Sequence, residues 1–296
     1  MNKIPLLMTG ATGLVGSRLV EMFADKYEIF GMDHSVGVDI TNIETVESFV
    51  ADHPASTVVH LAAFTNTNEA FKQNGDKTGS CYRVNVVGTQ NIAEVCKAHN
   101  IHLIHISTDF VFDGKSSEPY LEENPLSPIE WYGETKAMAE EVVKKSGVSY
   151  TIVRIAYPYR ATFEPKLDIV KKILAGLRAG TLYPQFTDTI ITPTLIDDIA
   201  RGLDLFVEKK VTGTYHVVGS DSMSPYQLAQ AVAKTYGFDP SVVKEGSLTK
   251  YLETNPRPFA RYARMSNAKF VAFSGLVPMT VALGLAEIKK QQDAQH

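Results

Sequence analysis

The segment TGATGLVG constrains the fold of this chain more than any other feature of its sequence. An apolar run, Ile4–Thr9, leads into it, and a helical pattern of apolar residues, Leu14–Lys26, follows it. Gly10, Gly13 and Gly16 permit a tight turn and a close approach of the backbone to a pyrophosphate group. A strand, a glycine loop and a helix in this order predict the first unit of a parallel α/β sheet that binds a dinucleotide.

Short apolar runs and longer helical patterns continue to alternate along the chain. The expected strands are Ile4–Thr9, Tyr27–Asp33, Thr57–Ala62, Ile101–Ser107, Tyr150–Ile155 and Gly213–Val218. The expected helices are Leu14–Lys26, Ile43–Asp52, Tyr82–Asn100, Ile129–Ser146 and Leu195–Lys209. This order predicts an α/β fold, a Rossmann-type doubly wound parallel sheet with crossover helices on both faces.

The remaining stretches are richer in Pro, Tyr and Arg, and their strand patterns are weaker. We expect them to form a smaller, discontinuous α/β substrate-binding lobe of residues 157–190 plus 221–296. The dinucleotide-binding domain would then consist of residues 1–156 plus 191–220.

Asp33 ends the second expected strand, about 20 residues past Gly13, at the spacing typical of a ribose-binding carboxylate. Such a carboxylate accepts hydrogen bonds from the adenosine ribose and repels a 2′-phosphate. His34 and Ser35 follow it, without an arginine that would bind a phosphate. The sequence therefore favours NAD(H) as cofactor, and NADP(H) stays open because Arg18 or Ser35 could receive the phosphate. The alternative interpretation is an ordinary Asp that caps a turn.

Tyr132 and Lys136, in the segment WYGETKAMAEE, are four residues apart and share one face of an expected helix. An ammonium group beside a phenol stabilises the phenolate and lowers the pKa of the phenol toward working pH. Such a tyrosine can exchange a proton with a carbinol oxygen while a hydride moves. This pair, downstream of the glycine loop, predicts an oxidoreductase.

These residues resemble those of the extended short-chain dehydrogenases/reductases, and the resemblance covers nearly the full length. Within that family the chain is most similar to the dTDP-4-dehydrorhamnose reductases. The similarity rests on VVHLAAFTNTNEA, VNVVGTQNIAE, HISTDFVFDG, PYLEENPLSPIEWYGETKAMAEE, TPTLIDDIA and the RP of NPRPF.

The resemblance implies an NAD(P)H-dependent reductase of a 4-keto nucleotide sugar, with Tyr132 as proton donor. The catalytic residues would be Thr108, Tyr132 and Lys136. The expected cofactor contacts include the glycine loop. They are Gly10, Gly13, Leu14, Val15, Gly16, Asp33, Asp39, Ile40, Ala62, Ala63, Phe64, Thr65, Asn85, Tyr132 and Lys136. The expected substrate contacts are Thr108, Asp109, Tyr157, Arg257 and Arg261.

Phe110 separates two reaction types. Nucleotide-sugar 4,6-dehydratases are similar in this stretch but have Thr-Asp-Glu, whose Glu removes a carbon-bound proton. This chain has Thr108, Asp109 and Phe110, and a phenyl ring offers no base. The segment therefore favours simple ketone reduction over dehydration.

Some positions depart from the family pattern. Tyr157 and Arg160, in RIAYPYR, replace a substrate-stacking Trp and a Gly, and FKQNGDKTGSC has an unusual spacing, so the substrate can differ from dTDP-4-dehydrorhamnose. Arg257, Arg261 and Arg264 would form one basic face toward a diphosphate if their segment were helical, and a solvated stripe otherwise.

Two other functions stay open. One is a nucleotide-sugar epimerase that holds NAD tightly, and the other is a regulatory subunit resembling the non-catalytic subunit of methionine adenosyltransferase. The sequence leaves the nucleotide base, the sugar stereochemistry and the oligomeric state undecided, with a homodimer as one alternative.

The composition narrows the partners and the compartment. A net charge of −4 without a dense Lys/Arg stripe argues against nucleic acid, and no apolar run approaches the length of a membrane span. The two cysteines, Cys81 and Cys96, imply no disulfide framework. We therefore expect a cytoplasmic protein. We also expect no metal site, because His102 and His105 would point to opposite faces of a strand.

Overall fold

The computed structural model describes residues 2–294, which divide into two compact units. Within the described residues, the first unit comprises residues 2–111, 126–154 and 200–215, and the second comprises residues 112–125, 155–199 and 216–294. Four stretches that the sequence analysis assigned to the dinucleotide-binding domain fall in the second unit, namely residues 112–125, 155–156, 191–199 and 216–220. The assignment of cofactor binding to one part and substrate binding to the other stays a prediction.

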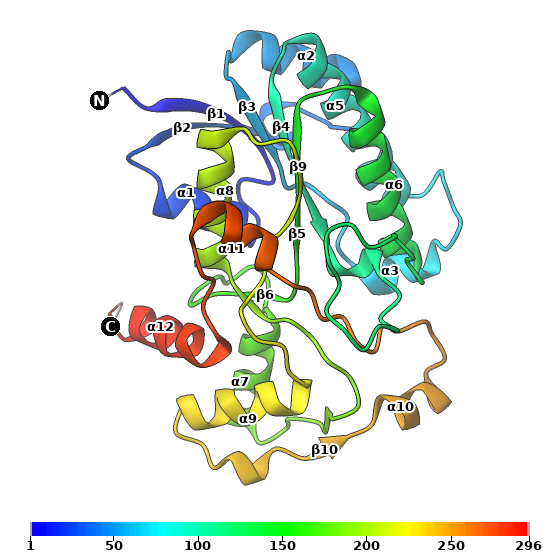
Figure 1. The fold of residues 1–296 in the computed structure, drawn as a ribbon, viewed down its shortest axis with the longest axis vertical. Coiled ribbons are helices and arrows are strands. Elements are labelled where there is room, and N and C mark those ends of the chain that lie inside the picture. The colour runs from blue at the N-terminus through cyan, green and yellow to red at the C-terminus, as the bar shows by residue number, and fades with distance from the viewer. Residues whose placement is uncertain (1, 295–296) are drawn as a thin grey trace. The chain divides into compact units, whose positions relative to one another are not determined.

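A six-stranded sheet in the order β2-β1-β3-β4-β5-β9 forms the centre of the first unit (Figure 1). Its strands are β1 (Ile4–Thr9), β2 (Tyr27–Met32), β3 (Thr57–His60), β4 (His102–Thr108), β5 (Tyr150–Ile155) and β9 (Gly213–His216). β1 pairs in parallel with β2 on one side and with β3 on the other, and β3 pairs in parallel with β4. The strand order therefore reverses at β1, and ligands bind outside the carboxyl ends of the strands at such a point.

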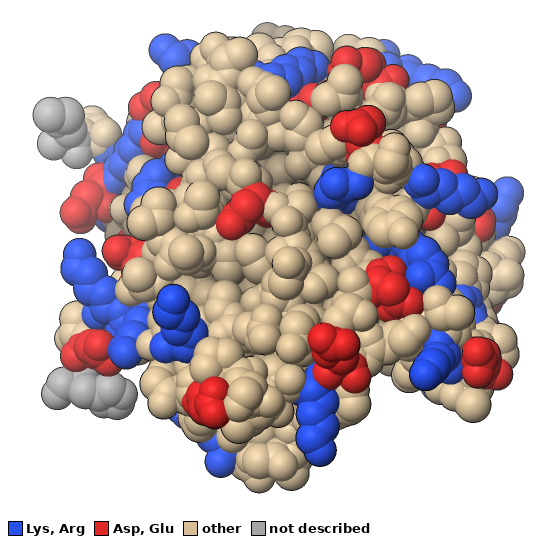
Figure 2. All heavy atoms as spheres, turned by 60° about the horizontal axis from the view of Figure 1, so that its bottom comes forward, with Lys and Arg blue, Asp and Glu red and all other residues tan. Residues whose placement is uncertain are grey.

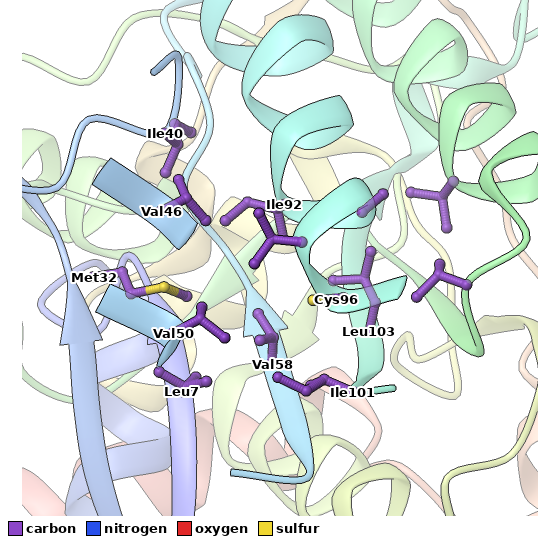
Figure 3. Packing of buried hydrophobic residues seen from close by; sticks show 14 of the residues in the cluster. Leu7, Met32, Ile40, Val46, Val50, Val58, Ile92, Cys96, Ile101 and Leu103 are labelled. Atoms are coloured by element: carbon purple, nitrogen blue, oxygen red, sulfur yellow. The ribbon is translucent and has the colours of Figure 1, made fainter. Parts of the chain in front are cut away.

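Helices cover both faces of this sheet because side chains alternate between the faces along each strand. Leu7, Val58 and Leu103 point to one face, where they pack against α2 (Ile43–Asp52) and α5 (Thr89–Ala98) (Figure 3). α6 (Trp131–Ser146) adds Val143 to the same cluster. α1 (Gly16–Met22) and α8 (Ile196–Lys209) lie on the opposite side of the sheet (Figure 1). The predicted doubly wound α/β fold is thus confirmed.

The expected helix 82–100 is divided into three parts. It consists of α4 (Ser80–Tyr82), a π-helical turn η2 (Arg83–Gly88) and α5. Single π turns within helices are frequent at functional sites. Here the wide turn carries Asn85, which is almost fully buried.

Short elements complete the first unit. They are η1 (His34–Val36), α3 (Thr67–Lys72) and η3 (Asp109–Val111), and each connects a strand to the following helix. Strand and helix types agree with the sequence expectations, and most ends move by one or two residues.

The second unit is mainly helical, with short strands, as its weaker strand patterns led us to expect. Its helices are α7 (Ile169–Ala179), α9 (Pro225–Thr235), η4 (Pro240–Val242), α10 (Leu248–Thr254), α11 (Ala268–Ser274) and α12 (Val281–Asp293), and it begins α8. Its two-stranded sheets are β6 (Pro158–Tyr159) with β8 (Thr194–Leu195), and β7 (Gln185–Phe186) with β10 (Glu245–Gly246). Apolar side chains of α7, α9 and α12 form its core around Tyr159.

The surface carries charges of both signs. On the face drawn in Figure 2, Lys and Arg side chains are interspersed with Asp and Glu rather than gathered in a stripe. Within residues 2–294, none of the helices combines the length and the apolar character that a membrane crossing requires.

Candidate active site

The glycine loop after β1 has the backbone geometry that a bound pyrophosphate requires. Gly10 has φ +67°, and a Cβ atom there would lie 3.0 Å from the backbone nitrogen of Ala62. At Gly16, a Cβ atom would collide with the carbonyl oxygen of Gly10. The amide of Gly13 donates a hydrogen bond of 3.0 Å to the same carbonyl and closes the turn. Side chains are excluded at Gly10 and Gly16, as expected for a loop whose backbone approaches a pyrophosphate, and Leu14 and Val15 lie between Gly13 and Gly16.

Asp33 follows β2 and already caps the short turn η1. Its Oδ1 accepts a 2.8 Å hydrogen bond from the Ser35 amide and another from the Ser35 hydroxyl. These bonds hold the pKa of the Asp33 carboxyl below its ordinary value, so the group is ionised at neutral pH. The turn-capping role is therefore observed, and the ribose-binding role stays a prediction.

Asp39 and Ile40 form a separate corner of the same unit. Asp39 accepts hydrogen bonds of 2.8 Å from the amide and the hydroxyl of Thr41. The side chain of Ile40 fills the space where Gly88, at the end of η2, lacks a side chain. Asn91 of α5 donates a 2.9 Å hydrogen bond to the Ile40 carbonyl. These contacts hold Asp39 and Ile40 in place, and the adenine ring of the cofactor is expected to lie beside them.

Asn85 holds the segment after β3, which includes Ala62, Ala63, Phe64 and Thr65. Its Oδ1 accepts a 2.8 Å hydrogen bond from the Phe64 amide, and its Nδ2 donates to the Phe64 carbonyl at 3.3 Å. The same Nδ2 lies 3.0 Å from the Thr135 hydroxyl, which donates to the Tyr132 carbonyl at 2.8 Å. Asn85 therefore ties the expected cofactor segment to the first turn of α6.

Two buried residues that the sequence analysis missed support this segment. Thr9 Oγ1 accepts a 3.0 Å hydrogen bond from the Ala62 amide and lies 2.7 Å from His60 Nδ1. His60 Nε2 lies 3.1 Å from the Thr89 hydroxyl. Burial, followed by the charge of Lys136, lowers the pKa of His60 to about 3, so its imidazole is neutral. Both residues end neighbouring strands, and that position is the signal in the sequence that could have identified them.

Thr108, Asp109 and Tyr132 come together at the carboxyl end of β4. The Thr108 hydroxyl donates a 2.9 Å hydrogen bond to Asp109 Oδ1 and lies close enough to the Tyr132 phenol to influence its pKa. The ring of Tyr132 packs edge-on against Phe110, with 5.3 Å between the ring centroids. Gly133 allows this approach, because a Cβ atom there would collide with the Phe110 carbonyl oxygen. The two hydroxyl groups are thus adjacent, as protonation of one substrate oxygen would require.

The pKa of Tyr132 differs from the sequence expectation. Burial, together with the charge of Asp109, raises the pKa of the Tyr132 phenol well above its ordinary value. Lys136 does not outweigh these two effects, because its ammonium donates a 2.6 Å hydrogen bond to the Ile106 carbonyl and lies 3.4 Å from His105 Nε2. Burial lowers the pKa of Lys136 to about 8. Tyr132 is therefore a neutral phenol, the form that can donate a proton.

Glu130 is a further residue that the sequence analysis missed. It occupies the N-cap position of α6, directly before Trp131, and only 7% of it is exposed. Its charge contributes to raising the pKa of both Asp109 and Tyr132. Burial is the largest cause of both shifts, and the charge of Glu130 adds to it at Asp109 and at Tyr132.

The expected basic face in the second unit does not exist, because residues 255–267 are not helical. Pro256 and Pro258 prevent a helix there, and the segment instead pairs with Ile190 through the carbonyl of Arg261 (2.7 Å) and the amide of Ala263 (2.9 Å). The i, i+4, i+7 interpretation of Arg257, Arg261 and Arg264 was therefore wrong.

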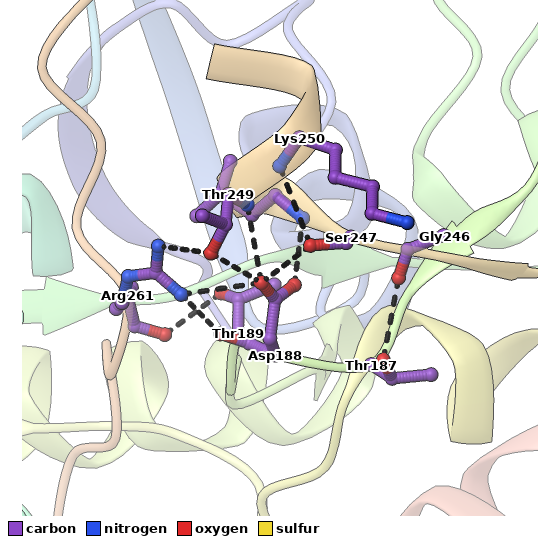
Figure 4. A network of polar contacts seen from close by, with 9 residues as sticks. Thr187, Asp188, Thr189, Gly246, Ser247, Thr249, Lys250 and Arg261 are labelled. Atoms are coloured by element: carbon purple, nitrogen blue, oxygen red, sulfur yellow. Dashed lines mark hydrogen bonds and ion pairs between the residues drawn. The ribbon is translucent and has the colours of Figure 1, made fainter. Parts of the chain in front are cut away.

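Arg261 binds a carboxylate of its own chain (Figure 4). Its Nη1 lies 3.2 Å from Asp188 Oδ2, and its Nη2 donates to the Thr249 hydroxyl at 2.7 Å. Asp188 also accepts hydrogen bonds from the amides of Leu248 (2.6 Å) and Thr249 (3.1 Å) and so caps α10. Burial alone would raise the pKa of Asp188, but these hydrogen bonds hold it well below its ordinary value. The contacts observed for Arg261 are therefore with residues of its own chain, where they stabilise the fold.

Tyr157 lies between β5 and β6 with φ +40°, a conformation that is rare for a bulky residue. Its carbonyl accepts a 3.2 Å hydrogen bond from the Thr194 amide. Contacts of Tyr157, Arg257 and Arg261 with a substrate stay predictions.

The fold and the site define the class. A doubly wound sheet with a glycine loop after its first strand and a Thr-Tyr-Lys group at β4 and α6 is that of an extended short-chain dehydrogenase/reductase. Residues 4–293 match the family described as the RmlD substrate binding domain. This chain belongs to that family, and the prediction of an oxidoreductase is confirmed.

Similar proteins carry related names. The dTDP-4-dehydrorhamnose reductase of Aggregatibacter actinomycetemcomitans is 32% identical over 81% of this chain and 80% of its own. The dTDP-4-keto-6-deoxy-D-glucose reductase of Streptomyces niveus is 31% identical over 80% of this chain and 81% of its own. The crystal structure of dTDP-4-dehydrorhamnose reductase from Bacillus anthracis in complex with NADP has a TM-score of 0.88 and 25% identity, with 98% and 99% of the two chains covered. The resemblance inferred from the sequence motifs is thereby confirmed.

Proposed function

We propose that this protein is an NAD(P)H-dependent reductase of a 4-keto nucleotide sugar, with Tyr132 as the proton donor. The observation that carries the proposal is that Thr108, at the end of β4, comes together with Tyr132, one helical turn from Lys136, in the same unit as the glycine loop. Family membership and the names of the similar proteins support a nucleotide-sugar ketone as the substrate class.

The roles of the residues follow from their chemistry. A bound nicotinamide dinucleotide supplies the hydride, and Gly10, Gly13 and Gly16 would hold its pyrophosphate. Tyr132 gives its phenolic proton to the substrate oxygen, and Thr108 orients that oxygen through a hydrogen bond. Lys136 lies one turn along α6 from Tyr132, and its positive charge would stabilise the phenolate that remains.

The decisive experiment is a panel of nucleotide 4-keto sugars, each offered with NADH and with NADPH and followed at the nicotinamide absorbance. Oxidation of the reduced cofactor by at least one sugar supports the reductase. Retained cofactor with a changed sugar configuration and no net oxidation would indicate an epimerase. Absence of turnover combined with tight binding to a partner protein would indicate a regulatory subunit.

Asp33 provides a test of cofactor choice. Asp33→Ala should lower NADH affinity about tenfold or more, because two ribose hydroxyls lose an acceptor worth about 1 kcal/mol each. NADPH should lose less, since the 2′-phosphate also loses a repelling charge. Titrations with both cofactors measure the ratio of affinities, and Ser35→Ala controls for loss of the turn. An unchanged ratio would show that Asp33 only caps η1.

Phe110 provides a test of reaction type. Incubation with a nucleotide hexose and NAD in heavy water should give no loss of water and no deuterium at C5. Removal of a carbon-bound proton needs a base within about 3 Å, and the ring of Phe110 packs on Tyr132 without offering one. Mass spectrometry and proton NMR follow both outcomes. A 4-keto-6-deoxy product would replace the reductase with a dehydratase.

A further inference from the structure

Three polar side chains lie in a row across the sheet, at the carboxyl ends of neighbouring strands. Thr9 of β1 is paired with His60 of β3, and His60 is paired with His105 of β4. Each follows by two residues a side chain of the apolar cluster under α5 and α6, so all three point to that face of the sheet. All three residues are at most 1% exposed. The row ends beside Lys136 of α6, whose ammonium lies 3.4 Å from His105 Nε2.

The hydrogen bonds around His60 fix which of its ring nitrogens carries the proton. A hydroxyl group has two lone pairs and one hydrogen. Both lone pairs of Thr9 Oγ1 are used, because it accepts hydrogen bonds from the amides of residues 61 and 62 at 3.1 and 3.0 Å. Its hydrogen is therefore donated to His60 Nδ1 at 2.7 Å, and the imidazole proton is on Nε2, which lies 3.1 Å from the Thr89 hydroxyl. Thr89 in turn donates its own hydrogen to the Asn85 carbonyl at 2.7 Å.

His105 carries its proton on the other nitrogen. A charged ammonium group has three hydrogens to donate and no lone pair. Lys136 Nζ donates one hydrogen to the Ile106 carbonyl at 2.6 Å, and its contact with His105 Nε2 requires that this nitrogen accept another. The imidazole proton is then on Nδ1, which has no hydrogen-bond partner among residues 2–294. The bond to Lys136 therefore orients the His105 ring, and the two neighbouring imidazoles hold their protons on opposite nitrogens.

This cluster holds its positive charge on Lys136. Burial, followed by the charge of Lys136, lowers the pKa of His60 to about 3 and that of His105 well below its ordinary value. Both imidazoles are therefore neutral near pH 7, whereas burial lowers the pKa of Lys136 only to about 8. The Ile106 carbonyl and the His105 ring thus hold the ammonium group through two acceptors that carry no charge.

The other titratable groups that act on Lys136 are either engaged elsewhere or uncharged. Glu140 lies one turn farther along α6, and both of its carboxylate oxygens are bound by Arg154. Cys81 belongs to α4, and burial raises the pKa of its thiol, so the thiol is uncharged near pH 7. A carboxylate at position 105 would instead form an ion pair with Lys136 and raise its pKa. A neutral acceptor combines a fixed direction of the ammonium group with an available charge.

We propose that His105 is a positioning residue for Lys136, a neutral acceptor that fixes the direction of the ammonium group and leaves its charge available. Because Ile106 and His105 bind two of the three ammonium hydrogens, the third can serve the site, where the positive charge would stabilise the phenolate that Tyr132 leaves behind. This use of the charge rests on the proposed function, whereas the anchoring of Lys136 and the two tautomers do not.

Nitrogen-15 NMR of the full chain without cofactor tests the tautomers directly. In protein labelled at histidine, the His105 signals should show a protonated Nδ1 and an unprotonated Nε2, and the His60 signals should show the reverse. His105→Gln and His60→Gln identify the signals by their loss. Lys136→Met should shift the Nε2 signal of His105, which loses its donor, and leave the tautomer of His60 unchanged. A protonated Nε2 on His105 in the wild-type protein would overturn the proposal.

Two variants separate hydrogen bonding from packing. His105→Leu fills the site but removes the acceptor, so the pKa of Lys136 should fall by about one pH unit, because the charged form loses a hydrogen bond. His105→Gln can place an amide oxygen where Nε2 lies and should keep this pKa within about 0.3 pH unit of wild type. Carbon-13 NMR of the lysine side chains follows the titration, and circular dichroism checks that each variant is folded. Glu141→Gln, an exposed change farther along α6, should leave the titration in place.

Kinetics test the consequence for catalysis. In wild type, kcat should fall above about pH 8, where Lys136 loses its charge. His105→Leu should shift this fall to lower pH by the same amount as the lysine titration, and His105→Gln should restore the wild-type profile. An unmoved Lys136 titration in His105→Leu, equal shifts in both variants, or a kcat profile that does not follow the titration would overturn the proposal. If the tautomers and the titration are as expected but no keto sugar is reduced, the proposed function fails and the anchoring of Lys136 stands.

Discussion

Tyr132→Phe is expected to lower kcat by about a thousandfold, because general acid catalysis contributes about 10²–10⁴ and phenylalanine has no proton to donate. The ring still packs against Phe110, so the fold and NADH affinity should change little. Stopped-flow or steady-state assays with the sugar found in the substrate panel measure the loss, and a fluorescence titration measures NADH binding. Because burial keeps the wild-type phenol protonated, the variant lacks the donor over the whole neutral range.

Tyr82→Phe is the matched control. Tyr82 stacks on Trp131, the neighbour of Tyr132, with 6.3 Å between the ring centroids. It belongs to the same aromatic cluster and would lose the same hydroxyl group. Its turnover should stay within about threefold of wild type. Turnover of Tyr132→Phe within tenfold of wild type would contradict the assignment of Tyr132 as the acid.

Glu140→Gln is expected to destabilise the protein by about 3–5 kcal/mol, because it leaves a buried guanidinium without its counter-charge. Glu140 on α6 and Arg154 on β5 are both at most 1% exposed. They form a two-pronged pair, with Arg154 Nε 2.8 Å and Nη2 2.7 Å from the two carboxylate oxygens. Urea unfolding followed by circular dichroism measures the free energy of unfolding.

The pH dependence of this effect has a defined sign. Burial alone would raise the pKa of Glu140, but Arg154 and Ser107 hold it below its ordinary value of 4.5. The ion pair therefore contributes fully above pH 4.5, and its contribution is lost as pH falls through the folded-state pKa. The difference between wild type and variant should be constant near pH 7 and shrink only in acid.

Glu141→Gln again serves as the control, because Glu141 is exposed and its change should cost less than about 0.5 kcal/mol. A loss below about 1 kcal/mol in Glu140→Gln would mean that water reaches the Arg154 guanidinium.

Local patterns were sufficient for most of the fold. Alternating apolar runs and helical periodicity placed the six strands and the helices α2, α5, α6 and α8, because burial of one face imposes these periods on the sequence itself. The glycine spacing likewise followed from a backbone requirement at Gly10 and Gly16, which no other residue type meets. The basic face that a helix would have given Arg257, Arg261 and Arg264 does not form, because Pro256 and Pro258 exclude a helix there whatever the charge spacing.

The sequence by itself determined the class of fold, the order of the elements and the residue types at the ends of the strands. The tertiary structure alone decided which residues contact one another: Asn85 contacts Phe64 and Thr135, and Arg261 contacts Asp188. The apolar periodicity that predicts a strand or a helix can be recognised within about a dozen consecutive residues. These contacts, by contrast, join residues that lie about 20 to 70 positions apart along the chain. The protonation of Asp109 and Tyr132 depends on burial and on charges brought in by other elements, which exist only once the chain is folded.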